Sequence, residues 1–159
     1  MRTNFYQSTL RLALACSMLW GASAFAEDAD EAEAYVEYRE KIMKNLGTQS
    51  GAIGDILKHK LPYGDHILIH AKGLQAASRL VMPAFKKEAM EEGGEAKAEI
   101  WQQWDKYVAA AKKLEDASDA LVAAAEKGDM KAVGVAMREV SGSCGSCHKP
   151  FRIKHSHKH

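Results

Sequence analysis

The sequence predicts an all-α protein folded as an antiparallel four-helix bundle. Apolar side chains recur every three or four residues along four segments, which is the period of an amphipathic helix, and there is almost no strand-like alternation. Short stretches with proline, glycine or aspartate separate these segments, and short connections make consecutive helices antiparallel neighbours. The length of 159 residues fits one domain, and 47% hydrophobic with 27% charged residues is an ordinary globular composition.

The first 26 residues have the composition of a cleavable signal peptide. Arg2 and Arg11 give a positive start, residues 12–25 are apolar, and Ala24-Phe25-Ala26 forms a small-x-small cleavage site. This apolar run is short for a membrane span. We therefore expect the domain 27–159 to be exported to the periplasm, with no membrane span in the mature form. A retained N-terminal anchor is the alternative.

Cleavage at this site leaves 20 Lys and Arg against 21 Asp and Glu, because the leader holds two arginines and no acidic residue. A nucleic-acid-binding protein has a clustered basic excess, so we expect no nucleic-acid partner. Cleavage also removes Cys16, and apolar residues after Cys16 disfavour a lipid-modified cysteine there. Cys144 and Cys147 remain, and in an oxidising compartment two such thiols are bridged, bound to metal or alkylated.

The first helix is expected from about Asp30 into the fifties. Its apolar face steps through Val36, Arg39, Met43, Leu46 and Ser50. Three glycines late in the segment, at positions 47, 51 and 54, suggest that the helix ends or loosens there. The stretch KLPYGD (60–65) is a break.

The second helix is expected to start after Asp65, a candidate N-cap, and to reach about Met90. Pro83 predicts a kink or an early end within it. Its apolar face carries Ile67, Leu74, Leu80 and Val81.

The last two helices follow the loop 91–96. The third has the clearest apolar face, formed by Ile100, Trp101, Trp104, Val108, Ala111, Leu114, Leu121 and Val122. The stretch KGD (127–129) ends it, and the fourth helix advances by three and four residues through Val133, Ala136, Val140, Cys144 and Cys147. Small residues toward the end of this helix leave a void that a large flat prosthetic group would fill.

The chemistry of the chain is concentrated at Cys144, Cys147 and His148. In a helix these residues stand at i, i+3 and i+4, so they project from one face. C-x-x-C-H is the signature of covalent haem attachment, in which two thiols form thioethers with the porphyrin and the imidazole binds the iron. Gly145 and Ser146 are small enough to let the ring approach the backbone.

Other interpretations of these residues stay open. A redox disulfide of the thioredoxin type belongs at the start of a helix in a strand-rich fold. A zinc site would need two further ligands from the irregularly spaced tail histidines, His155, His157 and His159. His66 and His70 lie one turn apart and could share a metal, although a solvated helix face is the more ordinary explanation.

Three stretches resemble the class II c-type cytochromes, which comprise the cytochrome c′ family and its low-spin relatives. YREKIMKNL (38–46) is similar to the first-helix pattern of the family, EIWQQW (99–104) to the opening of its third helix, and CGSCHKPFR (144–152) to its attachment motif with a following aromatic-Arg. The resemblance covers essentially the whole mature chain. It implies a four-helix bundle with one haem c covalently attached near the C-terminus.

Carried onto this sequence, the resemblance implies that Cys144 and Cys147 are the thioether anchors and that His148 is the proximal iron ligand. Arg39 resembles the first-helix arginine near a haem propionate, and Arg152 the arginine beside the proximal histidine. Both arginines are therefore expected to bind the haem near its propionates. Pro150 departs from the expected helix, because proline in the last turn can end it before Phe151 and Arg152.

Met43 falls on the distal position of the family pattern and separates two functions. If its sulfur binds the iron, the haem is six-coordinate and low-spin, which suits electron transfer with periplasmic redox partner proteins. If Met43 only lines the distal pocket, five-coordinate iron can bind NO or CO, as the resemblance implies.

We expect a periplasmic electron carrier, with a gas-binding cytochrome c′ as the alternative and a non-haem interaction domain with a local disulfide as a remote one. No enzyme is expected, because no second titratable cluster converges on the motif. A homodimer is compatible with the three glycines of the first helix, which would allow close approach of a second helix.

Overall fold

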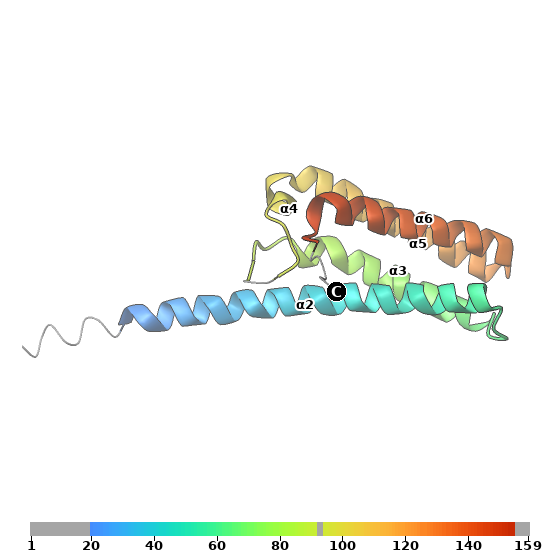
Figure 1. Ribbon diagram of the computed structural model, residues 1–159, viewed down its shortest axis with the longest axis horizontal. Coiled ribbons are helices and arrows are strands. Elements are labelled where there is room, and N and C mark those ends of the chain that lie inside the picture. Colours follow the sequence, from blue (N-terminus) through green and yellow to red (C-terminus); the bar gives the residue numbers. More distant parts are fainter. Residues whose placement is uncertain (1–19, 92–93, 155–159) are drawn as a thin grey trace, which may run out of the picture.

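The computed structural model describes residues 20–91 and 94–154, with side chains from residue 30 onward. This part of the chain contains α2 (Trp20–His59), α3 (His66–Ala84), α4 (Glu99–Gln102), α5 (Trp104–Glu126) and α6 (Met130–Phe151). The four long helices form the bundle seen in Figure 1, with α2 and α3 in one layer and α5 and α6 in the other. The predicted all-α four-helix fold is confirmed.

Three helix pairs hold the bundle together. α2 packs on α3, α3 on α5 and α5 on α6, whereas α2 and α6 contact each other only sparsely. The core between the helices is apolar and draws on all four of them, with Ile53, Ile67, Leu121 and Val133 each 0% exposed. The side of the bundle between the first and the last helix is therefore the one with the least packing.

α2 does not end at its glycines. It runs through Gly47, Gly51 and Gly54 to His59, and Lys60 follows with a left-handed φ of 52°. Ile53 and Ile56 are buried on either side of Gly54, so the packing of this face outweighs the low helix propensity of glycine. The expected end or loosening at these glycines is thus wrong.

The second helix ends early, one residue after Pro83. The expected extension to Met90 is wrong, and the proline explains why. Leu80, expected in the core, is 45% exposed, because the buried stripe passes through Ala77 and Val81 instead. Asp65 occupies the N-cap position, but its side chain makes no capping hydrogen bond.

The third helix is divided. Gln103, at φ −126° and ψ 45°, separates α4 from α5. α6 begins as the sequence indicates, with the side chain of Asp129 accepting hydrogen bonds from the backbone N–H groups of Lys131 and Ala132. Pro150 lies inside the last turn without ending it before Phe151, which is buried.

Most of the predicted signal peptide, residues 1–19, lies outside the described residues, and its cleavage stays a prediction. Within the described part of the chain, no helix combines the length and the apolar character that a membrane crossing requires.

Candidate haem site

The end of α6 brings the two cysteines and the histidine to one side of the helix. Cys144, Cys147 and His148 are half-buried, and both cysteines pack against the hydrophobic core. Gly145 and Ser146, which lie between the cysteines, are exposed. The arrangement on one helix face that the spacing predicts is therefore observed.

Both cysteines are free thiols. Burial raises the pKa of Cys144, and burial together with the neighbouring Cys144 raises the pKa of Cys147 to about 11. Thiols that act in redox exchange have a lowered pKa, since the thiolate is the nucleophile. The environment of these two thiols therefore disfavours a redox pair of the thioredoxin type.

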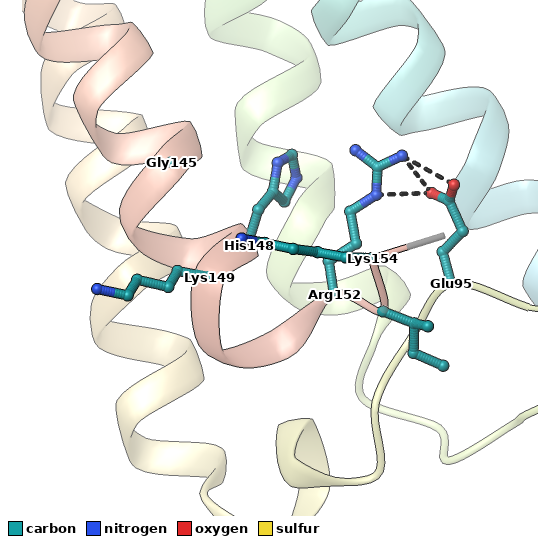
Figure 2. Close-up of a pocket in the computed structure, with 7 residues that line it drawn as sticks. Glu95, Gly145, His148, Lys149, Arg152 and Lys154 are labelled. Carbon is teal, nitrogen blue, oxygen red and sulfur yellow. Dashed lines mark hydrogen bonds and ion pairs between the residues drawn. The ribbon is translucent and has the colours of Figure 1, made fainter. Parts of the chain in front are cut away.

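A pocket of about 620 Å³ opens beside His148. It is lined by Glu95, Gly145, His148, Lys149, Arg152, Ile153 and Lys154. Figure 2 shows the imidazole of His148 and the guanidinium of Arg152 rising on the same side of the helix end, while Lys149 points away. Burial lowers the pKa of His148, and the Arg152 cation lowers it further, which favours the neutral imidazole that binds metals.

Arg152 is held by Glu95 through two parallel contacts. Its Nε donates to one carboxylate oxygen at 2.7 Å and its Nη2 to the other at 2.8 Å, as the dashed lines in Figure 2 mark. Backbone bonds flank the pair, since Lys97 N–H donates to Phe151 O at 3.0 Å and Ile153 N–H to Glu95 O at 2.7 Å. The loop before α4 thus fixes the end of the helix that carries the motif.

Arg39 on α2 is buried, at 3% exposure. Its Nε donates to Ala84 O at 2.9 Å, its Nη1 to Ala89 O at 2.7 Å and its Nη2 to Lys87 O. These contacts use three of the five N–H donors of a guanidinium. Within residues 30–91 and 94–154, no carboxylate forms an ion pair with Arg39, and burial lowers its pKa.

The cation of Arg39 also lies over two aromatic rings. Its guanidinium carbon is 4.8 Å from the ring centroid of Phe85 and 5.4 Å from that of Trp101. Trp101 donates its Nε1–H to Phe85 O at 2.8 Å, and Trp104 stacks on Tyr107. The two tryptophans pack against the core, as expected.

Tyr107 on α5 was not singled out in the sequence. It is 2% exposed, and its hydroxyl has no hydrogen-bond partner among the described residues. The sequence could have indicated its burial, because Tyr107 lies three residues after Trp104 on the apolar face of the third helix. Glu95 gave none, because it lies in a loop with no local pattern.

The remaining candidates are Met43, His66, His70 and the tail histidines. Met43 is partly buried and packs against the core from α2. His66 stacks on Tyr63 with ring centroids 5.1 Å apart, and His70 Nδ1 lies 2.8 Å from Gln49 Oε1. The described residues contain no group of three metal-binding side chains of His, Cys, Asp or Glu. The tail histidines of the zinc hypothesis lie outside the described residues.

The donor set fits haem c. It contains two free thiols and an imidazole of lowered pKa on one helix face, together with a buried cation and a buried hydroxyl for which the described residues provide no carboxylate and no acceptor. A helical bundle whose last helix ends in a C-x-x-C-H motif, with such a cation and hydroxyl on other helices, has the features of a c-type haem protein. The chain belongs to the cytochrome c′ family, whose model, described as Cytochrome C', matches residues 34–152. Proteins of this family bind one covalently attached haem c.

Individual relatives agree with this assignment. Cytochrome c′ of Rhodospirillum rubrum is 37% identical over 128 residues, which cover 80% of this chain and 86% of the relative. Cytochrome c-556 of Agrobacterium fabrum is 30% identical over 141 residues, covering 89% and 94%. Among solved structures, the nitric oxide complex of a leucine-to-alanine mutant of cytochrome c prime from Alcaligenes xylosoxidans is similar, with a TM-score of 0.72 at 28% identity, covering 78% of this chain and 97% of that one.

Proposed function

We propose that this chain is a periplasmic monohaem electron carrier in which Cys144 and Cys147 hold haem c through thioethers and His148 binds the iron. The observation that carries the proposal is the shared face of these three half-buried residues at the end of α6. The bound group would supply one-electron exchange between the ferric and ferrous states. The chain itself supplies attachment, an axial nitrogen and the charges around them.

Two arginines would supply the positive charges that bind the haem propionates. Arg39 has two N–H donors left after its carbonyl contacts, and a buried cation needs an anionic acceptor, so a haem propionate is the partner that suits it. Arg152 is held beside His148 by Glu95, and we assign it the same role near the propionates.

Met43 decides between electron transfer and a second candidate function, reversible binding of nitric oxide or CO at a vacant distal position. The second candidate is favoured by the nitric oxide complex of the similar Alcaligenes protein. A thioether is a soft ligand that suits haem iron, whereas a methionine that only fills space leaves the position open.

The test is a visible and EPR spectrum of ferric protein matured in a periplasm, compared with Met43→Leu, which keeps the side-chain volume and removes the sulfur. Met82→Leu, another partly buried methionine packed against the core, is the matched control. A low-spin spectrum that turns high-spin only in Met43→Leu supports the electron carrier with a methionine ligand. A high-spin wild-type spectrum contradicts the proposal that Met43 binds the iron and favours the gas-binding function. A colourless protein refutes the haem site.

We assign two kinds of partner. The first is a periplasmic redox partner protein, which electron transfer requires. The second is another copy of this chain, since Gly47 and Gly51 leave open space on α2 and Ile69 is 71% exposed on the neighbouring α3. Sedimentation of the purified protein would separate the dimer from the monomer.

A further inference from the structure

The hydroxyl of Tyr107 is a polar group that the described residues leave without a partner. It is buried, with its residue 2% exposed, and no described residue accepts its proton or donates to it. Buried polar groups are almost always hydrogen-bonded, because an unpaired one loses its water contacts without compensation. The acceptor for this hydroxyl is therefore to be sought outside the residues that the structure describes, and a bound group is the candidate.

Tyr107 lies where the motif-bearing end of α6 meets α5 and the segment after α3. Its ring makes an edge contact with Phe151, the last residue of α6, at 5.4 Å between centroids, and a tilted contact with Phe85 at 5.3 Å. Tyr107 also interacts electrostatically with Cys147 and with Arg39, so its phenol lies near both an attachment cysteine and the buried cation.

The chemistry of the surroundings identifies the acceptor. Arg39 is purely a donor and retains two N–H groups, and the thiol sulfur of Cys147 is at best a weak acceptor. Two donor groups that lack an anion point to a carboxylate. Haem c carries carboxylates in its propionates, and charge-assisted bonds to a carboxylate are stronger than neutral ones.

We propose that Tyr107 is a cofactor-binding residue whose hydroxyl donates a hydrogen bond to the haem propionate that Arg39 also binds. This inference rests on the proposed haem site. It adds to that site a second donor, from α5, for the same carboxylate.

The test is Tyr107→Phe in the holoprotein, which removes one oxygen and keeps the ring contacts. We expect the variant to fold, because its hydroxyl bonds to no described residue. Two properties are measured: the propionate bending mode in the resonance Raman spectrum and the reduction potential. The mode should shift, and the potential should fall, because a propionate that loses a donor keeps more negative charge and stabilises ferric iron. Tyr63→Phe, at an exposed tyrosine in the turn before α3, is the control and should change neither.

A Tyr107→Phe protein with a normal haem spectrum and both properties unchanged would overturn the proposal. A changed potential with an unchanged propionate mode would also overturn it, because the acceptor would then lie elsewhere. Failure of the proposed haem site looks different, since it would remove the haem spectrum from the wild-type protein itself.

Discussion

Ser78 on α3 and Ser118 on α5 face each other with their hydroxyl oxygens 3.0 Å apart, and both residues are 0% exposed. Each oxygen also lies within hydrogen-bond distance of a carbonyl in its own helix, at 2.8 Å from Gln75 O and 2.7 Å from Glu115 O. Two hydroxyl protons serve three contacts. The pair is therefore a self-contained polar link across the packing of α3 against α5.

This pair should show coupling in a double-mutant cycle. Ser118→Ala alone leaves the Ser78 hydroxyl with one partner fewer, and should lower the free energy of unfolding by about 1 kcal/mol. Adding Ser78→Ala removes the second polar group, so the double variant should lose less than the sum of the single variants, by about 0.5–1 kcal/mol. Urea unfolding of the holoprotein measures this, and strictly additive losses would refute the coupling.

Replacing Glu95 should change the reduction potential of the haem more than it changes the stability of the fold. Glu95→Gln removes a negative charge that acts on His148 and frees the Arg152 cation. Less negative charge near the iron favours the ferrous state, so the reduction potential should rise. The ion pair is about half exposed, with side chains 47% and 46% accessible, so the loss of stability should stay within about 1 kcal/mol.

Glu126→Gln is the matched control for that variant. Glu126 at the far end of α5 pairs with Lys72 at 3.4 Å and is similarly exposed. Its neutralisation should cost a similarly small free energy and leave the potential unchanged. Equal shifts of potential in both variants would show that net charge, rather than the position of Glu95, is responsible.

Arg39→Met should destabilise the protein strongly. It removes a buried cation and its contacts with the carbonyls of Ala84, Lys87 and Ala89, which then lack partners. We expect the free energy of unfolding to fall by about 3–5 kcal/mol. Arg138→Met, at an exposed position of α6, should change it by no more than about 0.5 kcal/mol. Comparable losses in the two variants would contradict the role given to the carbonyl contacts.

Replacing glycine with alanine should change the free energy of unfolding in opposite directions at two positions. Gly128, between α5 and α6, has a φ of +66°, so Gly128→Ala places a side chain in the left-handed region at a cost of about 1–2 kcal/mol. Gly134 lies inside α6 and, like Gly128, has open space where a Cβ would stand, so Gly134→Ala should raise the free energy of unfolding by about 0.5–1 kcal/mol. Thermal unfolding of both variants checks this, and a stabilised Gly128→Ala would refute the conformational argument.

Helix periodicity was enough to predict the bundle, because the apolar stripes that it identifies form the core. It failed where tertiary packing outweighs local preference. α2 continues through three glycines because Ile53 and Ile56 are buried there. The break between α4 and α5 at Gln103 could not be predicted, because the apolar pattern of the sequence is regular across it. Leu80 was wrongly predicted to lie in the core because it is apolar and adjacent to Val81, and only Val81 is buried.

The site divides in a similar way. Cys144, Cys147 and His148 could be named because their relation lies within one helical turn. Glu95 and Tyr107 could not, since the first depends on a partner 57 residues away and the second on a missing acceptor, and neither leaves a pattern along the chain.

The sparse contact between α2 and α6 has a thermodynamic consequence. The long helices form two hairpins, α2 with α3 and α5 with α6, which pack against each other mainly through α3 and α5. Separating the outer helices breaks few contacts, so partial opening from that side requires the least free energy, and amide hydrogens there should exchange early. A group that binds between α2 and α6 only when the chain is folded adds its binding free energy to the stability of the fold. Because haem c stays attached to the chain through its thioethers, the equilibrium linked to this opening would be the release of its noncovalent contacts, not the loss of the cofactor.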